Sequence, residues 1–227
     1  MTLPTVDWDR HGSRPRFNDR LDLTDPELYP LRASRPQAEF PVIHLDSAVI
    51  TSRQDAQEVR LKDARVDLED QPGVLHAALV DREGGWISRA LVSGFAENLD
   101  GLASTYNTTT HILVLGKQPE AMARASQRVR ELDGGIVVVQ ADEITYELAL
   151  PITGMASELP FAKVVEENRK FSRIVTEAGY EFHDILYTLL FLTNDFLPAL
   201  RLTPLGLLDV KSSSILVPAE TSMASNS

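Results

Sequence analysis

The clearest pattern in the chain is a succession of strand, helix and strand between residues 112 and 139. Two apolar runs, Ile112–Leu115 and Ile136–Val139, are short enough to be buried strands. Between them, apolar side chains recur at helical spacing from Pro119 to Leu132, with arginines at intervening positions. Pro119 suits a first helical turn, and Gly134-Gly135 suits a helix end. The pattern therefore predicts a helix that packs one face on a sheet.

Other short, β-branched runs predict further strands on both sides of this unit. They are Val42–Leu45, Ala48–Thr51, Glu58–Leu61, Val74–Val80, Trp86–Phe95, Ile144–Leu150, Leu200–Thr203 and Leu205–Val217. Apolar residues at helical spacing follow Ser157, which suits an N-cap, and a second apolar stretch ends at Leu192. The chain is thus predicted to be α+β, with one or two mixed sheets covered by the 119–132 helix and by a helical pair within residues 157–192.

Residues 1–41 differ from the rest of the chain because prolines recur among charged side chains. Prolines at this density disfavour helix interiors and central strands. Apolar side chains such as Trp8, Tyr29 and Phe40 are nevertheless too frequent for a free linker. We expect an extended arm that lies along its own domain or a neighbouring subunit, followed by a domain over residues 42–217 and a flexible tail over 218–227.

Several segments match one known family in the same order along the chain. They are Val80–Gly85, Val92–Phe95, Leu102–Ser104, Asp133–Val139, Leu150–Ser157 and Leu200–Val210. Together they resemble the C-terminal domain of the bacterial adenine deaminases of the amidohydrolase superfamily. The resemblance covers residues 40–217 and implies the fold of that domain. It also implies that the metal centre belongs to a separate barrel, whose His-x-His pair does not occur in this chain.

The chain departs from the family at its most polar positions. Where the family reads His-Asp-Ser-His-Asn, residues 107–111 read Asn-Thr-Thr-Thr-His, and the family's Glu-Arg-His-Gly-Gly is here Asp-Arg-Glu-Gly-Gly at residues 81–85. Threonine does not titrate near neutral pH, so this run is unsuited to general acid–base chemistry. If the family's pocket is retained, the resemblance implies Glu83 and His111 as catalytic residues, with Arg82 holding an anionic group. The substrate-binding set would be Arg82, Asn107, Thr108, Thr109, Thr110, Met155, Ser157 and Glu158.

Composition removes several classes of function. The 227 residues carry a formal charge of −11 and no basic cluster, which argues against a nucleic-acid partner. There is no cysteine, so disulfides and thiolate chemistry are excluded. Five histidines stand singly, and His44 and His76 are predicted to be hydrogen-bonded sheet residues rather than ligands. We therefore expect no cofactor in this chain, and a divalent metal only where a partner barrel supplies its site.

No apolar segment approaches the ~20 residues that a bilayer span needs, and the first 20 residues lack the apolar core of a secretory signal. We expect a cytoplasmic protein without membrane contact.

Three functions are compatible with these features. In the first, the chain is a detached domain of an amidohydrolase-type deaminase, docks on a separately encoded barrel subunit and acts on a purine-like or related cyclic small molecule. In the second, it is a diverged domain that binds or converts another small molecule in a metal-independent pocket of its own. In the third, it is a non-catalytic structural subunit. We favour the first, with a homo-oligomer as the alternative to the barrel partner.

Overall fold

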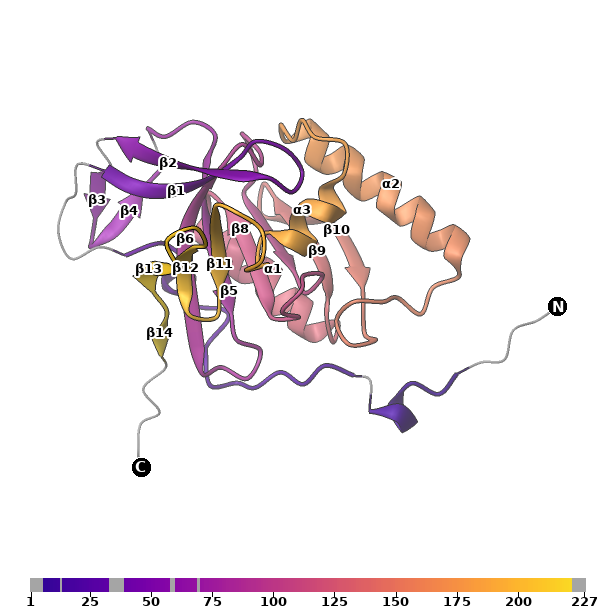
Figure 1. The fold of residues 1–227 in the computed structure, drawn as a ribbon. Coiled ribbons are helices and arrows are strands. Elements are labelled where there is room, and N and C mark those ends of the chain that lie inside the picture. The colour runs from indigo at the N-terminus through magenta and orange to yellow at the C-terminus, as the bar shows by residue number, and fades with distance from the viewer. Residues whose placement is uncertain (1–5, 13, 33–38, 58–59, 69, 222–227) are drawn as a thin grey trace, which may run out of the picture.

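A nine-stranded sheet runs through the middle of the molecule (Figure 1). The computed structural model describes residues 6–12, 14–32, 39–57, 60–68 and 70–221. In spatial order the strands are β10 (Glu143–Ala149), β9 (Gly135–Gln140), β7 (Gly101–Ser104), β8 (Ile112–Gly116), β5 (Val74–Val80), β6 (Trp86–Ser93), β1 (Glu39–Leu45) and β2 (Thr51–Gln57), and β14 (Glu220–Thr221) also pairs with β6. The pairing of β1 with β6 is parallel and the other pairings are antiparallel, so the sheet is mixed, as predicted.

The predicted strand, helix and strand succession is present as β8, α1 (Pro119–Glu131) and β9. The two strands are not neighbours, because β7 lies between them and pairs antiparallel with both. β8 and β9 therefore run parallel, and α1 connects them across one face of the sheet. Helix α1 buries Met122, Ala125 and Val129 against that face, as its helical spacing predicts.

The sheet is covered on both faces because alternate residues of each strand point in opposite directions. In β5, Ala78 and Val80 join the core beneath α1, whereas Ala77 and Leu79 join the core on the other side. That second face is covered by α2 (Phe161–Glu177), α3 (Ile185–Phe191) and a small sheet of β11 (Leu200–Thr203), β12 (Gly206–Asp209) and β13 (Ser214–Pro218). The α+β prediction with three covering helices is thus confirmed for the described residues.

The described part of the arm lies along its own domain. It carries two short 3₁₀ turns, η1 (Asp9–His11) and η2 (Pro26–Leu28). Leu23 and Tyr29 are buried in the core beneath α1, and the Tyr29 hydroxyl donates to the Leu23 carbonyl at 2.7 Å. The arm then leads toward a small hairpin of β3 (Arg60–Lys62) and β4 (Arg65–Asp67). Residues 1–5, 13 and 33–38 of the predicted arm, and residues 58–59 of a predicted strand, lie outside the described residues.

Two predictions about single elements are wrong: one about a strand and one about a helix cap. Residues 48–50 form a turn rather than a strand, because Ser47 Oγ accepts the N–H groups of Val49 and Ile50. Ser157 does not cap α2, whose N-cap position is occupied by Pro160; the Ser157 hydroxyl accepts the N–H of Leu159 instead.

The predicted flexible tail is in part a strand. Glu220–Thr221 forms β14 on the edge of β6, where Glu220 lies 2.5 Å from the buried guanidinium of Arg89. A buried cation needs a carboxylate partner, so this ion pair holds residue 220 against β6. Residues 222–227 lie outside the described residues. Among the described helices, none combines the length and the hydropathy required to cross a membrane.

Candidate functional site

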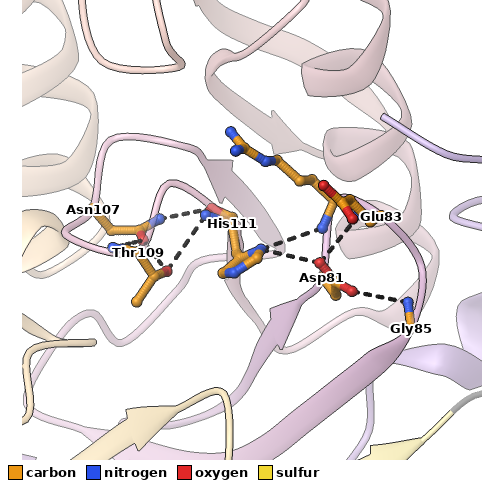
Figure 2. Close-up of polar contacts among 7 residues, drawn as sticks. Asp81, Glu83, Gly85, Asn107, Thr109 and His111 are labelled. Atoms are coloured by element: carbon orange, nitrogen blue, oxygen red, sulfur yellow. Dashed lines mark hydrogen bonds and ion pairs between the residues drawn. The ribbon is translucent and has the colours of Figure 1, made fainter. Parts of the chain in front are cut away.

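One edge of the large sheet gathers the loops that sequence analysis singled out. Because neighbouring strands are antiparallel, the end of β5 meets the starts of β6 and β8, and the end of β7 meets the starts of β8 and β9. The hairpin loop of residues 81–85 and the polar loop of residues 105–111 therefore lie side by side (Figure 2). We call this edge, defined by residues 81–85 and 105–111, the polar edge.

The hairpin loop is organised by Asp81. Its Oδ1 accepts the N–H of Glu83 at 3.1 Å, and its Oδ2 accepts the N–H of Gly85 at 2.9 Å. An aspartate at the first position of a turn commonly makes such bonds to the next backbone N–H groups. The turn leaves Arg82 half-buried and the Glu83 side chain exposed, so Glu83 is accessible to a ligand at the polar edge.

Asn107 fixes the conformation of the polar loop. Its side chain is fully buried, and its Nδ2 donates to the carbonyls of Ser104 and His111 at 3.2 and 2.8 Å. Its Oδ1 accepts both the N–H and the hydroxyl of Thr109, at 3.1 and 2.6 Å. All of the amide's polar atoms are therefore used inside the loop. The structure gives Asn107 a positioning role, because a ligand cannot reach its side chain.

The three threonines lie in different environments. Thr109 is bonded to Asn107, whereas Thr108 is exposed, and its hydroxyl lies 3.2 Å from that of Thr193 at the end of α3. Thr110 has a positive φ of 57°, a region that β-branched residues seldom adopt. Its backbone N–H donates to the Asn107 carbonyl at 3.0 Å, which closes the turn. The accessible hydroxyls of this run are those of Thr108 and, in part, Thr109 and Thr110.

His111 and Asp81 connect the two loops. Nδ1 of His111 lies 3.3 Å from Oδ1 of Asp81, and 22% of the His111 side chain is exposed. The ring also contacts Trp86 edge to face, with centroids 4.8 Å apart. The backbone N–H of Arg82 donates to the same Nδ1 at 3.4 Å. A proton on Nδ1 would pair with the carboxylate and leave Nε2 as the basic atom, whereas a lone pair on Nδ1 accepts the Arg82 N–H and leaves the proton on Nε2.

The surroundings of His111 favour its neutral form. Burial lowers the pKa of His111 below its ordinary value, and the charge of Arg82 acts in the same direction. Asp81 and Glu83 oppose this shift because a nearby negative charge stabilises the imidazolium. A neutral imidazole is suited to accept a proton near neutral pH.

The loop that carries Met155, Ser157 and Glu158 is held by other parts of the molecule. The Gly154 carbonyl accepts the Thr105 hydroxyl at 2.8 Å, and Glu158 pairs with Arg14 of the arm at 2.9 Å. Among the described residues, no hydrogen bond joins this loop to residues 81–83 or 107–111. The structure therefore brings Arg82, Glu83 and residues 107–111 together, and it places the 155–158 loop beside Thr105.

Sequence reasoning assigned no role to Asp81, although it is the partner of His111. The available signal was the Asp-x-x-Gly spacing of residues 81–84, which is typical of a turn stabilised by its first side chain. Four hollows of about 420 to 630 Å³ on the described surface have none of the predicted site residues in their lining. Within the described ranges, no group of three or more His, Asp or Glu side chains is arranged to hold a metal ion.

The match to a family model decides the affiliation of the chain. Residues 48–214 match the model of the adenine deaminase C-terminal domain, and this range contains both loops of the polar edge. The chain belongs to the adenine deaminase C-terminal domain family. The family that the resemblance indicated is thus confirmed.

Three relatives show how much of a longer protein this family domain represents. A protein of Bacillus cereus is 40% identical over 140 residues, which are 62% of this chain and 24% of the relative. A Bacillus subtilis protein is 32% identical over 94% of this chain and 35% of its own length, and one from Halalkalibacterium halodurans is 34% identical over 93% and 35%. Each is named a "putative adenine deaminase". The chain thus spans a quarter to a third of the relatives' length.

Proposed function

We propose that this chain acts as the C-terminal domain of an amidohydrolase-type deaminase and that its polar edge forms one wall of a site for a purine-like substrate. The observation that carries the proposal is the position of the Asp81–His111 pair at an ordered, open edge within the family domain. The remaining walls and the divalent metal would come from an amidohydrolase barrel. That metal would supply water activation, for which this chain's singly placed histidines provide no ligand set.

The residues of the polar edge have distinct parts in this proposal. In the tautomer that carries a proton on Nδ1, Asp81 holds the His111 ring, and Nε2 accepts a proton from the substrate or from a leaving group. The Arg82 guanidinium binds an electron-rich ring atom or an anionic group. Glu83 is exposed and serves as a second proton carrier, and the Thr108 hydroxyl offers a hydrogen bond. Asn107 preorganises the loop without touching the ligand.

A co-purification experiment tests the barrel partner. The full chain is isolated from its native host under mild conditions, and the sample is examined by mass spectrometry of associated chains, metal analysis and an adenine deamination assay. We expect a stoichiometric amidohydrolase barrel, bound divalent metal and release of ammonia from adenine. A metal-free homo-oligomer that is inert toward adenine would contradict the proposal and favour the diverged, metal-independent domain.

A pair of histidine variants in that complex tests the polar edge. His111→Gln removes the basic Nε2, and a general base contributes about 10²–10⁴-fold in rate. We expect kcat to fall by at least about 10²-fold. The matched control is His183→Gln, which alters an exposed histidine that precedes α3, and its rate should equal that of the unaltered complex. Equal rates in both variants would exclude His111 from catalysis while leaving the family assignment intact.

A further inference from the structure

A second cavity lies away from the polar edge, between the β3–β4 hairpin and the start of α1. Its volume is about 520 Å³, within the range of small-molecule sites. Its lining combines the strand residue His76, the hairpin residues Lys62 and Arg65, and Lys117 just before the helix. Three cationic side chains around one hollow are notable in a chain with a net charge of −11.

His76 presents an unused donor in this cavity. The side chain is 97% buried, since its exposed fraction is 3%. Its Nδ1 accepts the N–H of Leu31 at 3.4 Å, so the neutral ring carries its proton on Nε2. Among the described residues, no hydrogen-bond acceptor is found for Nε2. A buried donor without an acceptor is costly unless something in the cavity accepts its hydrogen bond.

Arg65 provides a second unused donor at the same cavity. Its Nη1 pairs with Glu27 at 2.5 Å, but its Nε is buried and has no hydrogen-bond partner within the described residues. Lys62 and Lys117 make no ion pair among the described residues. The cavity therefore collects the unpartnered Nε of Arg65, the Nε2 of His76 and two ammonium groups.

The beginning of α1 adds backbone donors. The Gln118 side chain does not cap the helix, and Pro119 at the first position has no N–H. The first intrahelical bond is donated by Met122 to the Gln118 carbonyl at 3.0 Å, so the N–H groups of Glu120 and Ala121 precede it. The positive end of a 13-residue helix favours an anion at this position.

Two carboxylates also line the cavity and limit what can bind. Both Asp67 and Glu120 repel a bare polyanion, and the exposed Glu120 can accept a hydrogen bond from a hydroxyl or amino group. A ligand that fits this lining carries one oxyanion for His76, Arg65 and Lys117, and a neutral donor for Glu120. From this arrangement we propose that the cavity binds a phosphate monoester of a hydroxyl-bearing small molecule, with free inorganic phosphate as the simpler source of the same oxyanion.

The test uses the full chain with two probes, inorganic phosphate and ribose 5-phosphate, at constant ionic strength set by chloride. Binding is measured by calorimetry, and the ring-nitrogen NMR signals of His76 are followed in the same titration. We expect both probes to bind and the Nε2 signal to shift, because that donor gains an acceptor. Tighter binding of ribose 5-phosphate assigns the site to phosphate esters, and equal affinity assigns it to free phosphate.

Substitutions of single lysines test whether the cations of the cavity bind the phosphate group. Lys117→Gln and Lys62→Gln each remove one ammonium group from the cavity, and we expect each to weaken binding by about tenfold, the size of one charge-assisted hydrogen bond. Lys211→Gln makes the same charge change at an exposed position in the β12–β13 connection, and its affinity should match that of the unaltered chain. No binding of either probe, no shift of His76, or equal weakening by all three substitutions would overturn the proposal.

Discussion

Nδ1 of His111 lies 3.3 Å from Oδ1 of Asp81, and this contact joins two loops that are 30 residues apart in the chain. The same Oδ1 accepts the N–H of Glu83, so one carboxylate orders the hairpin turn and orients the imidazole (Figure 2). The tautomer and the pKa of His111 are therefore tied to the geometry of the neighbouring turn.

Asp81→Asn should lower the pKa of His111 further. The carboxylate opposes the effect of burial, and the amide removes its charge while keeping one acceptor for the turn. The measurement is an NMR titration of the histidine ring signals in the full chain. Glu83→Gln is the matched control, because Glu83 acts on His111 through its charge without a hydrogen bond, and its effect should be smaller. A rise of the His111 pKa in Asp81→Asn would contradict the role given to Asp81.

The layers of the fold could be predicted from sequence, but the strand order could not. The helical spacing of α1 and the apolar runs of β5, β8 and β9 predicted these elements correctly, because burial of one helix face and two sheet faces leaves a periodic signal. The insertion of β7 between β8 and β9 leaves no such signal, since strand pairing depends on contacts distant in sequence. Likewise, the loop sequences indicated a polar site, whereas the burial of Asn107 and the pairing of Asp81 depend on how the two loops fold against each other.

Stability should fall on acidification because of His76. Burial lowers the pKa of His76 to about 4, from an ordinary value near 6.5, despite the opposing charge of Asp67. The unfolded chain therefore binds more protons between these two values. The stabilisation is complete above pH 6.5 and is lost as the pH falls toward 4, by roughly 3 kcal/mol in total.

Urea unfolding of the full chain at a series of pH values measures this effect. His76→Gln removes the titrating group and should flatten the dependence between pH 6.5 and 4. His183→Gln, at an exposed histidine, should leave the slope unchanged. A slope that survives in His76→Gln would assign the acid sensitivity to other groups.

Asn107→Ala should loosen the polar loop. The substitution leaves the carbonyls of Ser104 and His111 without the amide donor and frees Thr109. Loss of buried hydrogen bonds of this kind costs about 1–3 kcal/mol. Thermal unfolding gives the loss of stability, and hydrogen exchange at residues 107–111 locates it. Thr108→Ala alters an exposed residue of the same loop and should have little effect; equal losses would refute the special role of Asn107.

Gly84→Ala should displace the arm from the hairpin loop. Gly84 has a φ of +74°, and an added Cβ would lie 2.7 Å from Cβ of Arg20, beside the bond that Asn18 donates to the Arg82 carbonyl. Gly73→Ala is the matched control: its φ is +69°, but an added Cβ meets nothing within 4 Å. In both variants, placing alanine at a positive φ costs about 1 kcal/mol of stability. Only Gly84→Ala should increase proteolytic cleavage near residue 20, and equal cleavage would show that the contact does not hold the arm.

Arg201→Met should destabilise the region where α3 approaches the β1–β2 turn. Only 1% of Arg201 is exposed, and its guanidinium donates to the carbonyls of Leu197, Phe191, Val49 and Pro198, at 2.7 to 3.3 Å. Methionine fills a similar volume but leaves these buried acceptors without that donor, at a cost of about 3 kcal/mol. Burial lowers the pKa of Arg201 to about 10, so the side chain stays charged at neutral pH.

Urea unfolding compares Arg201→Met with Arg201→Lys and Arg169→Met. Lysine keeps the charge but has fewer donors and no fork geometry, so its loss should be intermediate. Arg169 is exposed on α2, and its substitution should change stability by no more than about 0.5 kcal/mol. Stability of Arg201→Met equal to that of the unaltered chain would contradict this prediction. It would mean that other donors bind the four carbonyls and that the guanidinium is not needed to hold α3 and β11 to the β1–β2 turn.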